Sequence, residues 1–154
     1  MIKFVDTLQN TTAFSLANVV MLDSTDPDPD ATSAGNYSTL NDVVSVLSLN
    51  DMVVATGPSS SLSLGFGSES GIQIPSAAGF DNQNAYGFLT VVDPNGASSD
   101  IAINLAQNYG TLNAGQSKSV TWYMVFGTSK ANVTNTYATV DGAPSSPESS
   151  TSGL

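Results

Sequence analysis

The stretch Ser119-Val120-Thr121-Trp122-Tyr123-Met124-Val125-Phe126 indicates the fold class of this chain. One set of alternate positions holds Val120, Trp122, Met124 and Phe126, and the other holds Thr121, Tyr123 and Val125. Successive side chains of a β-strand point to opposite faces, so this alternation predicts a strand. We expect this strand to lie near the centre of the core, with Trp122 as a core residue.

Shorter strand patterns precede this stretch, separated by Gly, Pro, Asn and Asp turns. They cover residues 2–8, 16–22, 43–49, 52–55, 62–66, 72–74, 86–92 and 101–105. The Asp93-Pro94-Asn95-Gly96 turn predicts a hairpin that joins the last two. Residues 133–140 fit a final strand or a short helix capped by Thr128 or Ser129. The sequence therefore predicts an all-β fold, an antiparallel β-sandwich of about 8–10 strands; a closed barrel has the same periodicity and fits the turn spacing less well.

A length of 154 residues fits one domain. We expect residues 1–142 to form the sandwich, and residues 143–154, rich in Ser and Pro, to form a linker or tail. The N-terminus lacks the basic and apolar regions of a signal peptide. Together these features indicate one module with neighbouring domains in a longer chain.

The composition excludes several classes of function. The formal net charge is −10, with three Lys and no Arg, so nucleic acid and anionic membrane surfaces are not expected partners. The absence of Cys and His removes thiolate sites and a Ser-His-Asp mechanism. No apolar run is long enough for a membrane helix, so we expect no membrane insertion. An Asp26 and Asp28 carboxylate pair would need a dry setting for glycoside hydrolysis, which a Pro-Asp-Pro loop does not provide. We therefore expect no enzyme.

The stretch Asp23-Ser24-Thr25-Asp26-Pro27-Asp28-Pro29-Asp30 places four carboxylates in a long acidic loop directly after an apolar run. The two prolines hold the backbone extended, which projects alternate carboxylates to a common side. Closely spaced oxygen ligands suit Ca²⁺ better than Mg²⁺, which demands a stricter octahedron. A solvated acidic turn is the alternative, because Asp-Pro pairs are ordinary turn formers.

Several stretches together resemble a β-sandwich module of large secreted bacterial proteins, the calcium-dependent RTX-type adhesins and surface proteins. The resembling segments are Asn10-Thr11-Thr12, Val19-Val20-Met21-Leu22, residues 26–30, 39–43 and 51–58, Leu62-Ser63-Leu64-Gly65, and residues 110–117 leading into the Trp122 strand. The chain lacks the glycine-rich nonapeptide repeat of a calcium β-roll, so calcium would sit in loops. The resemblance implies Ca²⁺ ligation by Asp26, Asp28 and Asp30. Asp23, Asn41, Asp42 and Asp51 are further nominees, because they are polar and lie beside predicted strand ends.

In such adhesins related modules bind peptides or sugars through Ca²⁺, and others only space or scaffold. We therefore expect a calcium-dependent adhesion module, secreted to a bacterial cell surface, that binds a peptide or glycan on a host or neighbouring cell. The nominated ligand-binding residues are Phe80, Asp81, Asn82 and Tyr86, which also fit loop tips with one core-anchoring Phe. One alternative is a purely structural module, a spacer or a filament or phage-particle subunit, whose residues 2–5 pair with a neighbour. Another is a carbohydrate-active accessory module with a groove lined by Tyr86, Tyr109 or Phe80.

Overall fold

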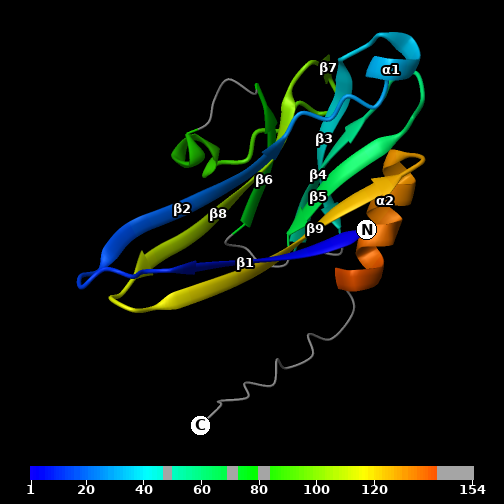
Figure 1. Ribbon diagram of the computed structural model, residues 1–154. Helices are drawn as coiled ribbons and strands as arrows, with labels where there is room; N and C mark the ends of the chain where they lie inside the picture. The colour runs from blue at the N-terminus through cyan, green and yellow to red at the C-terminus, as the bar shows by residue number, and fades with distance from the viewer. Residues whose placement is uncertain (47–49, 69–72, 80–83, 142–154) are drawn as a thin grey trace.

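A computed structural model describes residues 1–46, 50–68, 73–79 and 84–141, and over these ranges the chain is an antiparallel β-sandwich (Figure 1). The fold class predicted from the alternating stretches is confirmed. The strands are β1 Ile2–Gln9, β2 Leu16–Thr25, β3 Thr39–Val46, β4 Asn50–Thr56, β5 Ser63–Ser68, β6 Gln73–Ala78, β7 Ser98–Ser99, β8 Ala102–Leu112 and β9 Ser117–Gly127. The helical segments are α1 Ala31–Ala34, the 3₁₀ helix η1 Ala85–Phe88 and α2 Lys130–Asp141.

The strands form two sheets of unequal width. The larger sheet has the order β1-β9-β5-β4-β3-β7, and the smaller has the order β2-β8-β6. Every pairing in both sheets is antiparallel. β1 therefore lies at an edge of the larger sheet, with β9 as its single partner strand.

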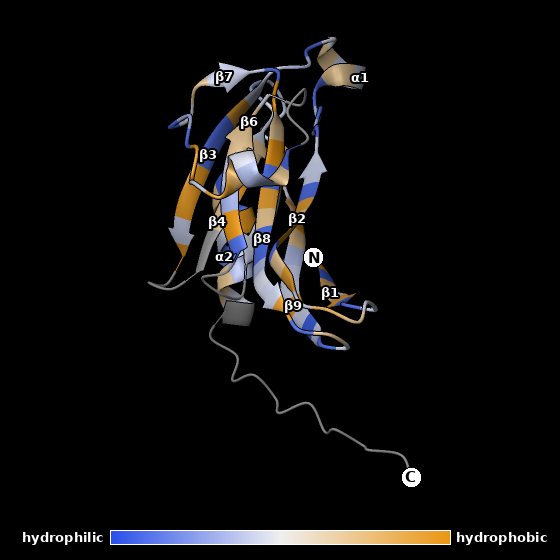
Figure 2. Ribbon diagram, turned by 90° about the vertical axis from the view of Figure 1, so that its left-hand side faces the viewer, coloured by the Kyte–Doolittle hydropathy of each residue, from blue (hydrophilic) through white to orange (hydrophobic). Residues whose placement is uncertain are grey.

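The main core lies between the two sheets, where apolar positions of β4, β5 and β9 face those of β6 and β8. Trp122 is 5% exposed and belongs to this core, as the alternation predicts. Figure 2 shows apolar positions interleaved with polar ones along the same strands. The buried members are Val53, Ala55, Phe66, Ala77, Ile103, Leu105 and Trp122.

A second core lies on the opposite face of the larger sheet, beneath α2 (Figure 1). Val133 and Tyr137 of α2 pack there against β9 residues Tyr123 and Val125. The segment that the sequence leaves open as strand or helix is thus a helix. Its first turn is capped by Ser129, whose Oγ accepts from the Asn132 N–H at 3.1 Å.

Two glycines of β5 let α2 approach the sheet closely. A Cβ atom built on Gly65 would lie 2.6 Å from Met52 Cε and 2.8 Å from Val133 Cγ1. A Cβ atom on Gly67 would overlap the ring of Tyr137. The absence of side chains at these two positions creates the space that α2 fills.

The hairpin predicted between residues 86–92 and 101–105 is wrong. Residues 85–88 form η1, which begins where Asn84 Oδ1 accepts from the Tyr86 N–H at 3.2 Å. The Asp93-Pro94-Asn95-Gly96 turn is hydrogen-bonded to β3 instead, because Asp93 Oδ1 accepts from the Val43 N–H at 3.0 Å. The mostly apolar composition of residues 86–92 resembles that of a strand, but the hydrogen bond that the Asn84 side chain accepts from the Tyr86 N–H favours a helical turn there.

The long acidic loop expected to begin at Asp23 is shorter in the structure. β2 continues to Thr25, and α1 occupies Ala31–Ala34. The strand expected at residues 72–74 continues past Pro75, which lies inside β6. β6 is an edge strand, where the missing N–H of proline is tolerated.

Candidate metal site

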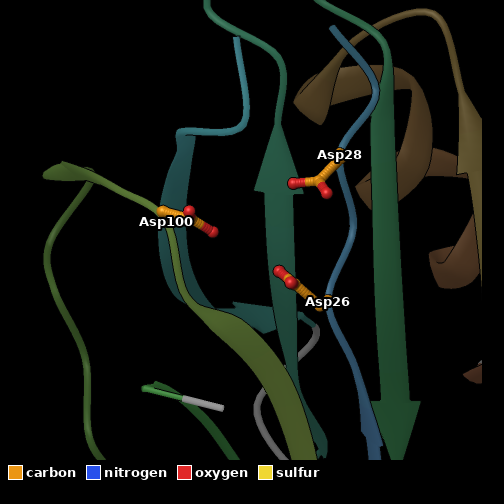
Figure 3. A group of neighbouring side chains, drawn as sticks. All are labelled: Asp26, Asp28 and Asp100. Carbon is orange, nitrogen blue, oxygen red and sulfur yellow. The ribbon is translucent and has the colours of Figure 1, made fainter. Parts of the chain in front are cut away.

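Three carboxylates meet where the chain leaves β2 and where it enters β8. Single carboxylate oxygens of Asp26, Asp28 and Asp100 all lie within 4.8 Å of one another. Asp26 and Asp28 follow β2, and Asp100 lies between β7 and β8. Figure 3 shows the three side chains directed toward the space between these two segments. The site therefore combines two distant parts of the sequence.

Negative charge at this site is poorly compensated. Burial and the neighbouring charges of Asp28 and Asp100 raise the pKa of Asp26. Burial and the charge of Asp100 raise the pKa of Asp28. Asp28 Oδ1 is buried without a hydrogen-bond partner. Among the described residues, no lysine forms an ion pair with any of the three carboxylates. A bound cation would lower the free energy of this arrangement.

The donor set suits a hard divalent cation. Three carboxylates offer up to six oxygens when each binds through both, and Ca²⁺ takes six to eight oxygens in a flexible geometry. Asp26 and Asp100 are exposed, so water has access to the site. The residues present fit Ca²⁺, with remaining positions open to water or to a ligand.

Asp30, nominated with Asp26 and Asp28, is not part of this group. It is fully buried, and its Oδ2 accepts from the Ser59 N–H at 2.7 Å while Oδ1 accepts from the Ser60 N–H at 3.1 Å. Hydrogen bonds from the Ser60 side chain and from the backbone of Ser59 and Ser60 lower the pKa of Asp30. Its carboxylate therefore fastens the acidic stretch to the turn between β4 and β5.

Among the described residues, neither Asp23 nor Asp42 belongs to the group of three carboxylates. Asp23 Oδ2 accepts from Gln107 Nε2, and Asp42 forms an ion pair with Lys130. Asn41 is buried, and its Nδ2 donates to the Thr39 carbonyl at 2.9 Å. The side chain of Asp51 lies outside the described residues.

Of the nominated ligand-binding residues, Phe80, Asp81 and Asn82 lie outside the described residues. Tyr86 lies in η1 and is exposed, with its hydroxyl donating to the Asn18 carbonyl of β2. Tyr109 is fully buried and therefore lines no surface groove. This burial removes one of the aromatic residues on which the carbohydrate-binding alternative depends.

An apolar groove of about 370 Å³ adjoins the three carboxylates and shares Asp28 with them. Leu62 and Phe126 on its walls are 46% and 53% exposed, large values for apolar side chains. The full lining is Pro27, Asp28, Pro29, Leu62, Ser63, Leu64, Phe126 and Gly127. An apolar group of a ligand could thus bind within reach of the candidate cation.

Sequence reasoning missed Asp100. This residue lies outside the acidic stretch, in the Ser-Ser-Asp-Ile segment before β8, with no local motif. The pairing of β2 with β8, which sets Thr25 opposite Ile103, brings the two segments together. Only the register of that pairing could have identified Asp100.

Comparison with protein-family models, with curated proteins and with solved structures finds no match for this chain. Neither α1 nor α2, nor any other helix in the described ranges, has the length and apolar character required to cross a membrane.

Proposed function

We propose that this chain is a calcium-binding β-sandwich module that serves in adhesion at a bacterial cell surface. The observation that carries the proposal is the convergence of Asp26, Asp28 and Asp100 within 4.8 Å. A Ca²⁺ ion held there would link the segment after β2 to the segment before β8. It would also satisfy the buried Asp28 Oδ1, which has no hydrogen-bond partner.

The groove beside Asp28 is the proposed place for a peptide or glycan ligand. Its wall residues Leu62, Leu64 and Phe126 offer apolar contact, and a calcium ion next to them would offer a coordination position to a ligand oxygen. Apolar contact supplies affinity, while coordination fixes orientation. Ligand binding at this groove would therefore depend on calcium.

The test is a thermal unfolding scan in excess EGTA, in millimolar CaCl₂ and in MgCl₂. An ion that binds only the folded state at about 100 times its Kd adds about 2.7 kcal/mol. For a chain of this length that raises the unfolding midpoint by about 5–10 °C. We expect this rise with calcium, and a much smaller rise with magnesium.

Two variants and a matched control sharpen the test. Asp28→Asn and Asp100→Asn each remove one proposed ligand and should abolish the calcium-dependent rise. Asp42→Asn removes the same charge from the ion pair with Lys130 and should retain the rise. Identical wild-type curves in EGTA and CaCl₂ would eliminate the calcium proposal. If the calcium-dependent rise in midpoint persisted in Asp100→Asn, the ion would bind at another site.

A second candidate function is a purely structural module that assembles with neighbours through strand pairing. The observation in its favour is the free edge of β1. Ile2 and Val5 on this strand are 48% and 51% exposed. An open strand edge with exposed apolar side chains is a template for pairing with another chain.

A further inference from the structure

A polar network connects the two sheets at the side where β1 faces β2. Gln107 of β8 is fully buried, and its Nε2 donates to Asp6 Oδ2 of β1 at 2.9 Å and to Asp23 Oδ2 of β2. Its Oε1 accepts from the Tyr109 hydroxyl at 2.9 Å. Both donors and the acceptor of this amide are therefore engaged, and the amide bridges a carboxylate from each sheet.

The single tryptophan of the chain belongs to the same network. Trp122 Nε1 of β9 donates to Asp6 Oδ2 at 2.5 Å, and its ring stacks on Phe4 with centroids 4.3 Å apart. The network thus includes β1 and β9 from the larger sheet and β2 and β8 from the smaller one. A change in charge at Asp6 or Asp23 would alter the electrostatic environment of the Trp122 indole.

No positive charge balances the two carboxylates within this network. Lys118 of β9 is the nearby cation, but its Nζ donates to the Tyr109 carbonyl at 2.7 Å. The remaining groups that face Asp23 are Asp6 from β1 and the neutral side chains of Gln107 and Tyr109 from β8. When both carboxylates are ionised, only neutral donors hold them together.

Burial and the charge of Asp6 raise the pKa of Asp23 to about 6, and the hydrogen bond from Gln107 acts in the opposite direction. Burial, Asp6 and Asp23 raise the pKa of Tyr109 to about 12, so its hydroxyl remains a donor at neutral pH. Asp23 therefore changes charge between pH 4 and 8, while the Tyr109 hydroxyl stays protonated.

We propose that Asp6, Asp23 and Gln107 form a clasp between the two sheets that is closed when one carboxyl group is protonated and loosened when both are ionised. Protonation removes one of two adjacent negative charges. Loosening affects β1 first, because β9 is the one strand that pairs with β1 among the described strands. The clasp makes the attachment of this edge strand depend on pH.

The sign of the pH effect follows from linkage. The ordinary pKa of an aspartate is 3.8, and the folded chain raises that of Asp23. Between these two values the folded state binds more protons than the unfolded state. Folding is therefore favoured as the pH falls from about 7 toward 4, and this contribution disappears as the pH rises through about 6.

The test uses Trp122 fluorescence as a reporter, recorded from pH 4 to pH 8 in excess EGTA. We expect a wild-type transition with a midpoint near pH 6. Asp23→Asn keeps an acceptor for Gln107 but cannot ionise, so the transition should vanish. Gln107→Met removes the donor that lowers the pKa of Asp23, so the midpoint should move to higher pH. Asp42→Asn removes a charge elsewhere and should leave the transition unchanged.

Hydrogen exchange of residues 2–9, corrected for the intrinsic effect of pH, gives an independent readout. Protection of β1 should be greater at pH 5 than at pH 7.5 in the wild type and equal at both pH values in Asp23→Asn. Wild-type fluorescence that is flat across the range would overturn the proposal. Persistence of the transition in Asp23→Asn would overturn it as well, because another group would then be responsible.

Discussion

Aspartates only a few residues apart in the acidic stretch have opposite electrostatic environments. Asp26 and Asp28 have raised pKa values, because burial and neighbouring carboxylates destabilise their charges. Asp30 has a lowered pKa, because hydrogen bonds from Ser60 and Ser59 stabilise its charge. The first two therefore suit cation binding, while Asp30 contributes to the stability of the folded chain.

At the residue scale we predict that Asp30→Ala lowers the unfolding midpoint by several degrees in both EGTA and CaCl₂. The substitution removes the buried carboxylate that accepts from the N–H groups of Ser59 and Ser60. Because the pKa of Asp30 is lowered, its contribution is present above the ordinary value of 3.8 and is lost as the pH falls below it. The difference in midpoint between wild type and variant should therefore be larger at pH 7 than at pH 3. A loss confined to CaCl₂ would instead make Asp30 a metal ligand.

The sequence predicts only part of the group of three carboxylates, for a physical reason. Asp26 and Asp28 come together because they share one extended segment, which a local pattern reveals. Asp30 was placed with them because spacing alone does not show that a turn 29 residues away donates to its carboxylate. Asp100 depends on strand register, which short-range patterns do not encode.

Among the elements, the position of α2 depends on the absence of side chains at two positions of β5. The helix covers the outer face of the larger sheet because Gly65 and Gly67 leave room for Val133 and Tyr137. A strand with larger residues at these positions would hold the helix away from the sheet and leave the core of Met52, Val54 and Val125 open to water.

We predict that Gly67→Ala destabilises the fold by about 1–3 kcal/mol, the usual cost of overpacking. The added methyl group would overlap the Tyr137 ring, which is held by a hydrogen bond to the Ser68 carbonyl. Urea unfolding measures the change. Gly79→Ala is the matched control, because a Cβ at that glycine meets nothing within 4 Å. Equal stability of the two variants would contradict this account of α2 packing.

Elements with strict alternation were predicted well, and elements without it were not. β9 and β5 each place apolar side chains at every second position, which a strand requires. Residues 86–92 are apolar without a clear period, and in the structure Phe88 is buried while Tyr86 and Val91 are exposed. That pattern fits a helical turn followed by an irregular segment, and hydrophobicity alone does not distinguish it from a strand.

At the scale of the whole molecule, the unequal sheets leave β1 as a free edge. The larger sheet ends at β1, and the side chain of Val5 on that strand is half exposed. Lys3 is the only lysine on this strand, and charged side chains at an edge normally oppose pairing with another chain. The structural candidate function requires that another chain pairs with this edge, whereas the adhesive function does not.

If the module assembles by strand pairing, we predict concentration-dependent association in EGTA that Val5→Lys abolishes. A second positive charge on the strand would oppose approach of another copy. Light scattering coupled to size-exclusion chromatography measures the mass. Val91→Lys is the matched control, because Val91 has similar exposure on a different segment and should associate as the wild type does. A monomer at every concentration would remove the structural candidate.

The position of β1 beside β9 also determines the order in which the chain can fold during synthesis. The hydroxyl groups of Thr7 and Ser119, which lie 112 positions apart in the sequence, are hydrogen-bonded to each other. β1 therefore stays without its partner strand until β9 has been synthesised. Contacts so distant in sequence slow folding and expose an aggregation-prone edge in the meantime. Translation that stops between β1 and β9 would release a chain in which β1 lacks the strand it pairs with.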